Sequence, residues 1–378
     1  MKKLLLVSII ALFLTGPVLA ADSDNPIKEI ISSEWVSFSG EYFLGYKAGN
    51  DGGTDYSVFE IRRAYLTAKK TLVPGLLSSR ITLDTNQDGD GDGEGDMEAR
   101  IKYAYAKLHL KDFLFINKAS VEFGMVHAPW LDYEQSIDHY RMRDKMFIER
   151  VGIVNSGDFG VTFFGLLGGE MDKEFKKKIG KKYAGYWGSF ALGLYNGGGY
   201  HAVENNTNKT FEARLSLRPL PIHLPGLQVS YFLTNGEGNK AGFADETPDW
   251  VINSFFISYQ APSYTLTGQY ASGEGNQKGS WYFDNLFFPN DISQALEWEG
   301  YSVFGEKKFL KDWLVIAGYD FFDPDSRLEE DTYTTVFGGV GYDFGGKNIL
   351  LFDYNVKNYE ASNVDSNTWM QVTMQIKF

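Results

Sequence analysis

The feature that most constrains the fold is an alternation of apolar and polar residues with a period of two, which recurs along most of the chain. The last segment shows it clearly, because one of its faces is apolar and the other is polar. The apolar face carries Met370, Val372, Met374, Ile376 and Phe378, and the polar face carries Gln371, Thr373, Gln375 and Lys377. Successive side chains of a strand point to opposite faces, so this period predicts β-strands.

The alternation delimits sixteen candidate strands. They lie near 35–46, 57–71, 77–86, 99–110, 119–126, 158–167, 184–195, 209–218, 226–235, 249–260, 264–272, 296–307, 312–322, 331–344, 348–356 and 367–378. Short connections such as 73–75 alternate with long ones such as 127–157, and an even number of strands returns both termini to one side. No segment after residue 21 approaches the ~20 apolar residues that a membrane helix requires. We therefore expect an all-β fold, a transmembrane antiparallel β-barrel with lipid on its apolar face and a water-filled lumen.

The first residues predict export from the cytoplasm. Lys2 and Lys3 precede an apolar run, Leu4 to Leu14, that is too short to span a hydrocarbon layer of ~30 Å. The small residue Ala20 suits cleavage by a signal peptidase. The expected organisation is a signal peptide at 1–20, a short periplasmic N-terminal segment at 21–34 and the barrel at 35–378.

Composition excludes several classes of protein. The 378 residues include no cysteine and only five histidines, which excludes a disulfide scaffold, a thiolate zinc site and a cysteine nucleophile. The formal net charge of -13 argues against nucleic acid as a partner. No histidine lies in a serine-hydrolase signature such as Gly-x-Ser-x-Gly, so we expect neither an enzyme nor a resident cofactor.

Four segments carry a family resemblance. They are Phe59 to Leu66 (Phe-Glu-Ile-Arg-Arg-Ala-Tyr-Leu), Gly124 to Pro129 (Gly-Met-Val-His-Ala-Pro), Glu134 to Ser136 and Phe147 to Arg150 (Phe-Ile-Glu-Arg). The chain resembles the phosphate-selective porin O and P family of Gram-negative outer membranes. The resemblance implies a sixteen-stranded barrel, a third loop between Gly124 and Arg150 that folds into the lumen and narrows the pore, and passive diffusion of small hydrophilic solutes or anions. It also implies a homotrimer, surrounded by outer-membrane lipid and lipopolysaccharide, whose final Phe378 is read by the barrel assembly machinery.

Basic residues on the third loop and on neighbouring strands are the candidate pore lining. The anion-contacting candidates are Arg62, Arg80, Arg100, Lys102, Arg141, Arg143, Lys145 and Arg150. Arginine suits phosphate-like groups because its planar guanidinium donates two hydrogen bonds at once. Strand parity places Arg80 on the lumen side, and of the adjacent Arg62 and Arg63 only one can point inward, for which we expect Arg62. The alternative is that these side chains pair with lumen acids and only order the wall.

An acidic connection predicts a second, metal-binding site. Asp88, Asp90, Asp92 and Asp96 match the first half of a calcium-binding loop, with a glycine at the sixth position. The twelfth position, where a glutamate should close the coordination shell, is Ala99. The alternative is a hydrated acidic outer loop without bound calcium.

Two further readings of the barrel remain open at this point. One is a sheath or scaffold around a partner such as a multihaem cytochrome, whose haem would belong to the partner because the chain has no Cys-x-x-Cys-His motif. The other is a soluble periplasmic all-β protein.

Overall fold

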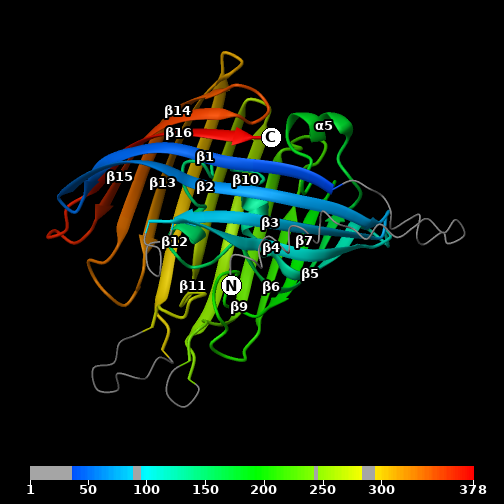
Figure 1. Ribbon diagram of the computed structural model, residues 1–378, viewed down its shortest axis with the longest axis horizontal. Helices are drawn as coiled ribbons and strands as arrows, with labels where there is room; N and C mark the ends of the chain where they lie inside the picture. Colours follow the sequence, from blue (N-terminus) through cyan, green and yellow to red (C-terminus); the bar gives the residue numbers. More distant parts are fainter. Residues whose placement is uncertain (1–35, 88–94, 242–245, 283–293) are drawn as a thin grey trace, which may run out of the picture.

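The structure is a computed structural model that describes residues 36–87, 95–241, 246–282 and 294–378. The expected signal peptide (1–20) and N-terminal segment (21–34) lie outside the described residues. The described chain forms one closed barrel, in which the start of the first strand and the end of the last strand lie on the same side (Figure 1). Among the described residues, no helix is both long and apolar enough to cross a membrane.

Sixteen antiparallel strands of the described chain build the barrel, which confirms the fold expected from the alternation. The strands are β1 (Val36–Asp51), β2 (Thr54–Val73), β3 (Leu77–Gln87), β4 (Met97–His109), β5 (Ile116–His127), β6 (Gly157–Leu167), β7 (Gly188–Tyr195), β8 (Thr210–Leu217), β9 (Leu227–Glu237), β10 (Asp249–Ala261), β11 (Tyr264–Glu274), β12 (Glu297–Phe309), β13 (Trp313–Asp323), β14 (Tyr333–Asp343), β15 (Ile349–Tyr359) and β16 (Asn367–Lys377). Each strand pairs with its sequence neighbours, and β16 pairs with β1 to close the barrel.

The two faces of the wall differ as the alternation predicts. On β16, Met370 and Val372 are 43% and 40% exposed on the outer face, whereas the inward Gln371 and Thr373 are 1% and 0% exposed. Closure satisfies the backbone hydrogen bonds of every strand, so the outer face needs only apolar side chains to be compatible with lipid.

Connections at the end that carries the termini are mostly shorter than those at the opposite end, and two connections depart most from this pattern. The first is the tight turn between β1 and β2, made by Gly52 and Gly53 with φ of 55° and 86°. Positive φ at both central residues is the requirement of a two-residue hairpin turn, which glycine meets without strain. The second is the link between β6 and β7, which contains helix α5 (Lys173–Lys178) beside the C-terminus (Figure 1).

A β-bulge corrects the expectation for Arg62 and Arg63. Opposite β2, Phe43 pairs with Arg63 and Leu44 pairs with Ile61, so Arg62 is an extra residue without a partner on β1. A bulge shifts the alternation by one residue. Arg62 therefore faces the lumen in phase with Glu60, and Arg63 faces the lumen in phase with Tyr65. The expectation that only one of the two arginines points inward is wrong. Lys102 occupies the same kind of position on β4, between the paired residues Ile101 and Tyr103.

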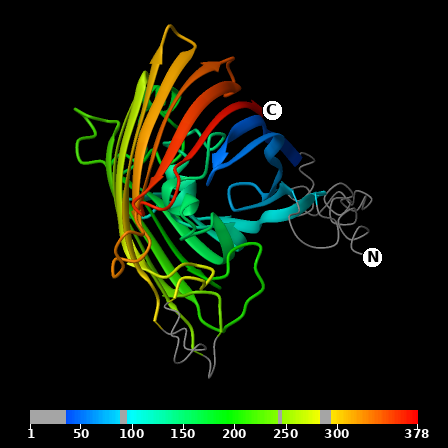
Figure 2. The same ribbon diagram turned by 90° about the vertical axis from the view of Figure 1, so that its left-hand side faces the viewer.

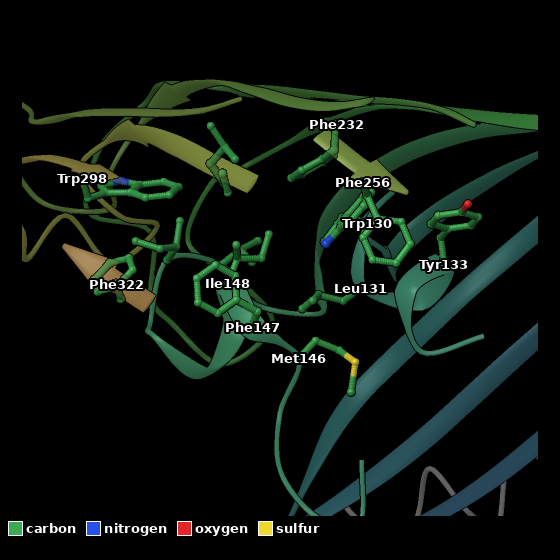
Figure 3. Packing of buried hydrophobic residues seen from close by; sticks show 14 of the residues in the cluster. Trp130, Leu131, Tyr133, Met146, Phe147, Ile148, Phe232, Phe256, Trp298 and Phe322 are labelled. Atoms are coloured by element: carbon green, nitrogen blue, oxygen red, sulfur yellow. The ribbon is translucent and has the colours of Figure 1, made fainter. Parts of the chain in front are cut away.

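The interior of the barrel contains an apolar core. The loop between β5 and β6 (128–156, here L3) includes the short helices α3 (Leu131–Glu134) and α4 (Phe147–Arg150) and lies inside the wall (Figure 2). Apolar side chains of L3 pack on inward-facing aromatic residues of β9 to β13 (Figure 3). The Trp130 ring stacks on Phe232 at 5.4 Å between centroids and meets the edge of Phe256 at 5.3 Å. Each such aromatic pair contributes about 1 kcal/mol beyond burial. L3 is therefore anchored to one side of the lumen.

Candidate pore constriction

L3 reaches across the lumen and is held by hydrogen bonds to the opposite wall. Arg62 donates to the backbone oxygen of Met142 at 3.0 Å, and the Gln371 amide donates to the backbone oxygen of Arg143 at 2.9 Å. On the side of the apolar core, Asp320 of β13 accepts from Arg150 at 2.5 Å. Since L3 is fixed both by its apolar seat and by these polar contacts, it forms a rigid narrowing of the lumen. The expected third loop inside the pore is what the structure contains.

Basic side chains gather where L3 faces β2 to β4, and we call this group the eyelet. It comprises Arg63, Arg100, Lys102, Arg141 and Lys145, together with Tyr65, Asp84 and Glu149. The Tyr65 hydroxyl accepts from Lys102 Nζ at 3.3 Å and lies 3.5 Å from Arg141 Nε, so it joins the strand wall to L3. Five cations against two carboxylates leave an excess of positive charge in this group.

The two carboxylates of the eyelet are buried and paired. Asp84 is 0% exposed, and its Oδ2 lies 3.4 Å from Arg63 and 3.1 Å from Arg100. Glu149 accepts two hydrogen bonds from the Arg141 guanidinium, at 2.5 and 2.7 Å. Burial alone would raise the pKa of Glu149, but the charge and hydrogen bonds of Arg141 lower it to about 2. Glu149 is therefore charged near neutral pH, and both acids hold the surrounding arginines in place through the contacts above.

The structure separates the eight candidate residues into two groups. Arg100, Lys102, Arg141 and Lys145 belong to the eyelet, and Arg80 lines the lumen below it. The other three act as anchors: Arg62 pairs with Glu60 at 3.1 Å, Arg150 pairs with Asp320, and Arg143 is buried. The Arg143 guanidinium lies 3.6 Å from the ring centroid of Phe337, behind L3, which corrects its expected place on the pore surface. The contacts of these three residues therefore fit the alternative stated above, in which basic side chains order the wall and do not contact the solute.

His127 orients Arg80. Its Nε2 lies 3.1 Å from Arg80 Nη1, and its Nδ1 lies 3.1 Å from the Glu122 carboxylate. A guanidinium has only donors, so Nε2 must accept, which leaves Nδ1 to carry the proton and donate to Glu122. This arrangement requires a neutral imidazole in one tautomer. Arg80 also lies 4.9 Å from the Tyr103 ring, so its position is set on two sides.

Below the eyelet, towards the end with the termini, the lumen widens into a cavity of about 840 Å³, here the vestibule. Its lining is basic. The cations are Lys69, Arg80, Lys102, Arg141, Lys176, Lys177, Lys181, Lys182, Lys308, Lys347 and Lys377, and the acids are Glu41, Asp132, Asp138, Glu306 and Asp343. Eleven cations thus face five acids, in a chain whose formal net charge is -13. Basic residues therefore outnumber acids on the lining of the vestibule, although the whole chain is acidic.

Behind L3, a second cavity of about 20 Å³ has space for a single water and is lined by two L3 carboxyl groups, Glu134 and Asp138. Burial, reinforced by Asp138, raises the pKa of Glu134 to about 8. Burial also lowers the pKa of the nearby His139 to about 4, with Lys347 contributing. Glu134 and His139 are consequently neutral near pH 7, in contrast to the charged Glu149 of the eyelet.

Several of these residues were missed at the level of sequence. Arg63 was excluded by regular alternation, and only its place beside a second arginine hinted at a bulge. His127 and Tyr65 entered only as members of two segments of the family resemblance, with no role of their own. For the calcium loop, Asp88, Asp90 and Asp92 lie outside the described residues, and Asp96 is an exposed residue just before β4. Calcium binding there stays a prediction.

Comparisons with known proteins identify the fold. No protein-family model and no curated protein matches the chain. Solved structures do match over 91% of this chain. They include Salmonella typhi OmpF in complex with daunomycin (13% identity, TM-score 0.61, 97% of that chain) and an anion-selective porin from Comamonas acidovorans (12%, 0.61, 99%). A third is the in-vitro folded trimer form of Vibrio cholerae OmpT (13%, 0.54, 99%). The chain therefore has the fold of outer-membrane porins, and its closed barrel with an apolar outer face belongs in an outer membrane.

Proposed function

We propose that the protein is an outer-membrane channel for passive diffusion of small hydrophilic solutes, that it favours anions, and that phosphate-like groups are among them. The observation that carries the proposal is the continuity of positive charge from the eyelet into the vestibule, against an overall charge of -13. An anion passing this way exchanges water for guanidinium and ammonium contacts. One of the similar structures is that of an anion-selective porin, which is consistent with this proposal. Assembly as a homotrimer is part of the proposal, because another similar structure is a trimer form.

A sheath around a partner protein is the less favoured function. Such a barrel would need its lumen for the partner, whereas L3 fills one side of this lumen with a packed apolar cluster and crosses to β2 and β16. The same packing is what a permanent pore constriction requires.

Reconstitution in a planar lipid bilayer tests the proposal. We expect stepwise currents in KCl, a reversal potential of anionic sign in a KCl gradient, and a smaller chloride current when phosphate is added. Lys102→Gln should lower the anion preference, whereas Lys209→Gln, an exposed residue of the loop before β8, should not. A cation-selective potential would overturn the anion preference, and a correctly folded barrel without steps would overturn the channel itself.

A further inference from the structure

The link between β6 and β7, residues 168–187, is a folded unit and not a loose turn. We call it the insertion. Asp172 caps α5 by accepting from the backbone N–H of Phe175 at 2.7 Å. A small apolar cluster of Met171, Phe175 and Ala184 holds the two halves of the insertion together. The Arg218 guanidinium lies 4.6 Å from the Phe175 ring and attaches the insertion to the wall just beyond β8.

One carboxylate of L3 accepts two hydrogen bonds from the insertion, beside the edge-on contact of the Tyr133 and Tyr183 rings. Asp132, in helix α3 of L3, accepts from Lys182 Nζ at 2.5 Å and also from the Tyr183 hydroxyl. Burial would raise the pKa of Asp132, but the charge of Lys182 and the hydrogen bonds from Lys182 and Tyr183 hold it well below its usual range, so the carboxylate is charged at neutral pH. We call Asp132, Lys182 and Tyr183 the latch.

A buried arginine supports the latch from the wall. Arg214 of β8 is 1% exposed and donates to the backbone oxygen of Pro129, at the start of L3, at 3.0 Å. Its guanidinium lies 4.2 Å from the Tyr133 ring of L3 and 4.9 Å from the Tyr183 ring of the insertion. Both segments therefore pack on the same fixed cation, which defines where the insertion sits relative to L3.

The insertion also lies on the path of a solute. Lys176, Lys177, Lys181 and Lys182 line the vestibule, the same cavity that Lys102 and Arg141 of the eyelet reach from the other side. A solute that has passed the eyelet therefore moves along the insertion before it leaves the barrel.

We propose that the insertion is a second constriction of the channel, and that Asp132 is the positioning residue that holds it beneath L3. The inference rests on the proposed channel function. Asp132 acts through Lys182 and Tyr183, and it neutralises the charge of one vestibule lysine. Its loss should therefore release the insertion from L3 and allow the insertion to move. The current through the open pore is then set jointly by an outer loop and by a connection on the side of the termini.

Thiol modification tests this placement, since the chain has no cysteine and an introduced one is the only reactive thiol. Lys181→Cys places a thiol on the vestibule lining. Lys178→Cys is the matched control, because Lys178 lies on the same insertion, pairs with Glu174 at 2.6 Å and is not part of the lining. An anionic methanethiosulfonate reagent, added on the side of the termini, should lower the unitary current of Lys181→Cys by roughly twofold and leave Lys178→Cys unchanged.

Latch variants test the positioning role. Asp132→Asn and Tyr183→Phe keep side-chain size and remove one partner each, and both should increase open-channel noise and reduce the block in the Lys181→Cys background. If the Lys181→Cys channel opens in steps like those of the wild type and the reagent does not change its current, the inference is overturned while the proposed channel function stands. The same block in both cysteine variants would overturn it as well. Absence of steps in the unmodified protein would overturn the proposed function, and this inference with it.

Discussion

Asp84 holds two arginines at once in the eyelet, and this decides what removing one of them should do. Arg63 and Arg100 approach the same carboxylate oxygen, at 3.4 and 3.1 Å, and the Tyr200 hydroxyl lies 3.2 Å from it. A buried carboxylate that loses its only cation destabilises a fold by several kcal/mol, on the order of 3–5. Asp84 would keep Arg100 and Tyr200 if Arg63 were replaced. The barrel should therefore fold without Arg63, and the effect of its loss should appear in conduction.

Arg63→Gln should weaken anion preference although regular alternation places this residue outside the lumen. We expect the anion-to-cation permeability ratio to fall roughly twofold, because one eyelet charge is lost in a partly desolvated site. Arg63→Lys, which keeps the charge, should retain most of the ratio. Reversal potentials in a KCl gradient measure both. An unchanged ratio in Arg63→Gln, together with a changed one in Arg62→Gln, would show that Arg63 does not contribute to the conduction path.

At the scale of elements, L3 shows what the sequence could and could not predict. Alternation predicted sixteen strands, and it predicted L3 as the long charged connection. The sequence indicates less clearly the part of the wall on which L3 packs. On β10, the side chains of Phe255 and Ile257 face outward. Those of Trp250, Ile252 and Phe256 face inward, so this strand carries apolar residues on both faces. Strands buried on both faces read as continuous apolar runs. That run indicates a covered inner face but not which loop covers it, because the contact joins residues about a hundred positions apart. The bulge at Arg62 and the latch at Asp132 were not predictable for the same reason, since each depends on pairing or contact across the barrel.

The docking of L3 should depend on pH through Glu134. The pKa of this carboxyl rises from 4.5 to about 8 in the docked loop, so between these values the docked loop holds a proton that the undocked loop releases. Docking therefore weakens as pH rises through the window, and burial of Asp138, which raises its pKa too, acts in the same direction. His139, with a pKa lowered from 6.5 to about 4, has the opposite slope, but only below about 6.5. Above pH 6.5 Glu134 dominates, and the free energy of docking L3 becomes less favourable by about 1 kcal/mol per pH unit.

Open-channel noise measures this dependence. We expect noise from L3 movement to increase as pH rises from near neutral to the pKa of Glu134, and to stay low in Glu134→Gln, whose amide does not ionise. Glu174→Gln is the control, because Glu174 lies on the exposed side of α5 and contacts Lys178, not L3. Equal noise across the window in the wild type would show that Glu134 does not control docking.

At the scale of the whole molecule, closure of the barrel depends on the seam between the first and last strands. β1 and β16 pair from Glu41 and Lys377 to Asn50 and Thr368 without a register shift. Every other strand pair is joined by a nearby connection, whereas the seam brings together the two ends of the chain. The loop-closure entropy of forming it is therefore the largest in the molecule. Defects there should affect the barrel as one cooperative unit.

Gly49 lies in this seam opposite Trp369, and a side chain there has no space. A Cβ at Gly49 would lie 2.2 Å from the backbone oxygen of Thr368 and 2.7 Å from Cβ of Trp369. Because the nearest atom is backbone, β1 and β16 would have to separate, and Gly49→Val should destabilise the barrel by about 1–3 kcal/mol. Gly338→Ala on β14 is the control, since its nearest contact would be an ordinary 3.8 Å. The temperature at which the folded, fast-migrating form is lost on SDS gels should fall for Gly49→Val and stay close to wild type for Gly338→Ala. Equal temperatures for both variants would mean that the seam does not limit the stability of the barrel, and that unfolding begins at another strand pair.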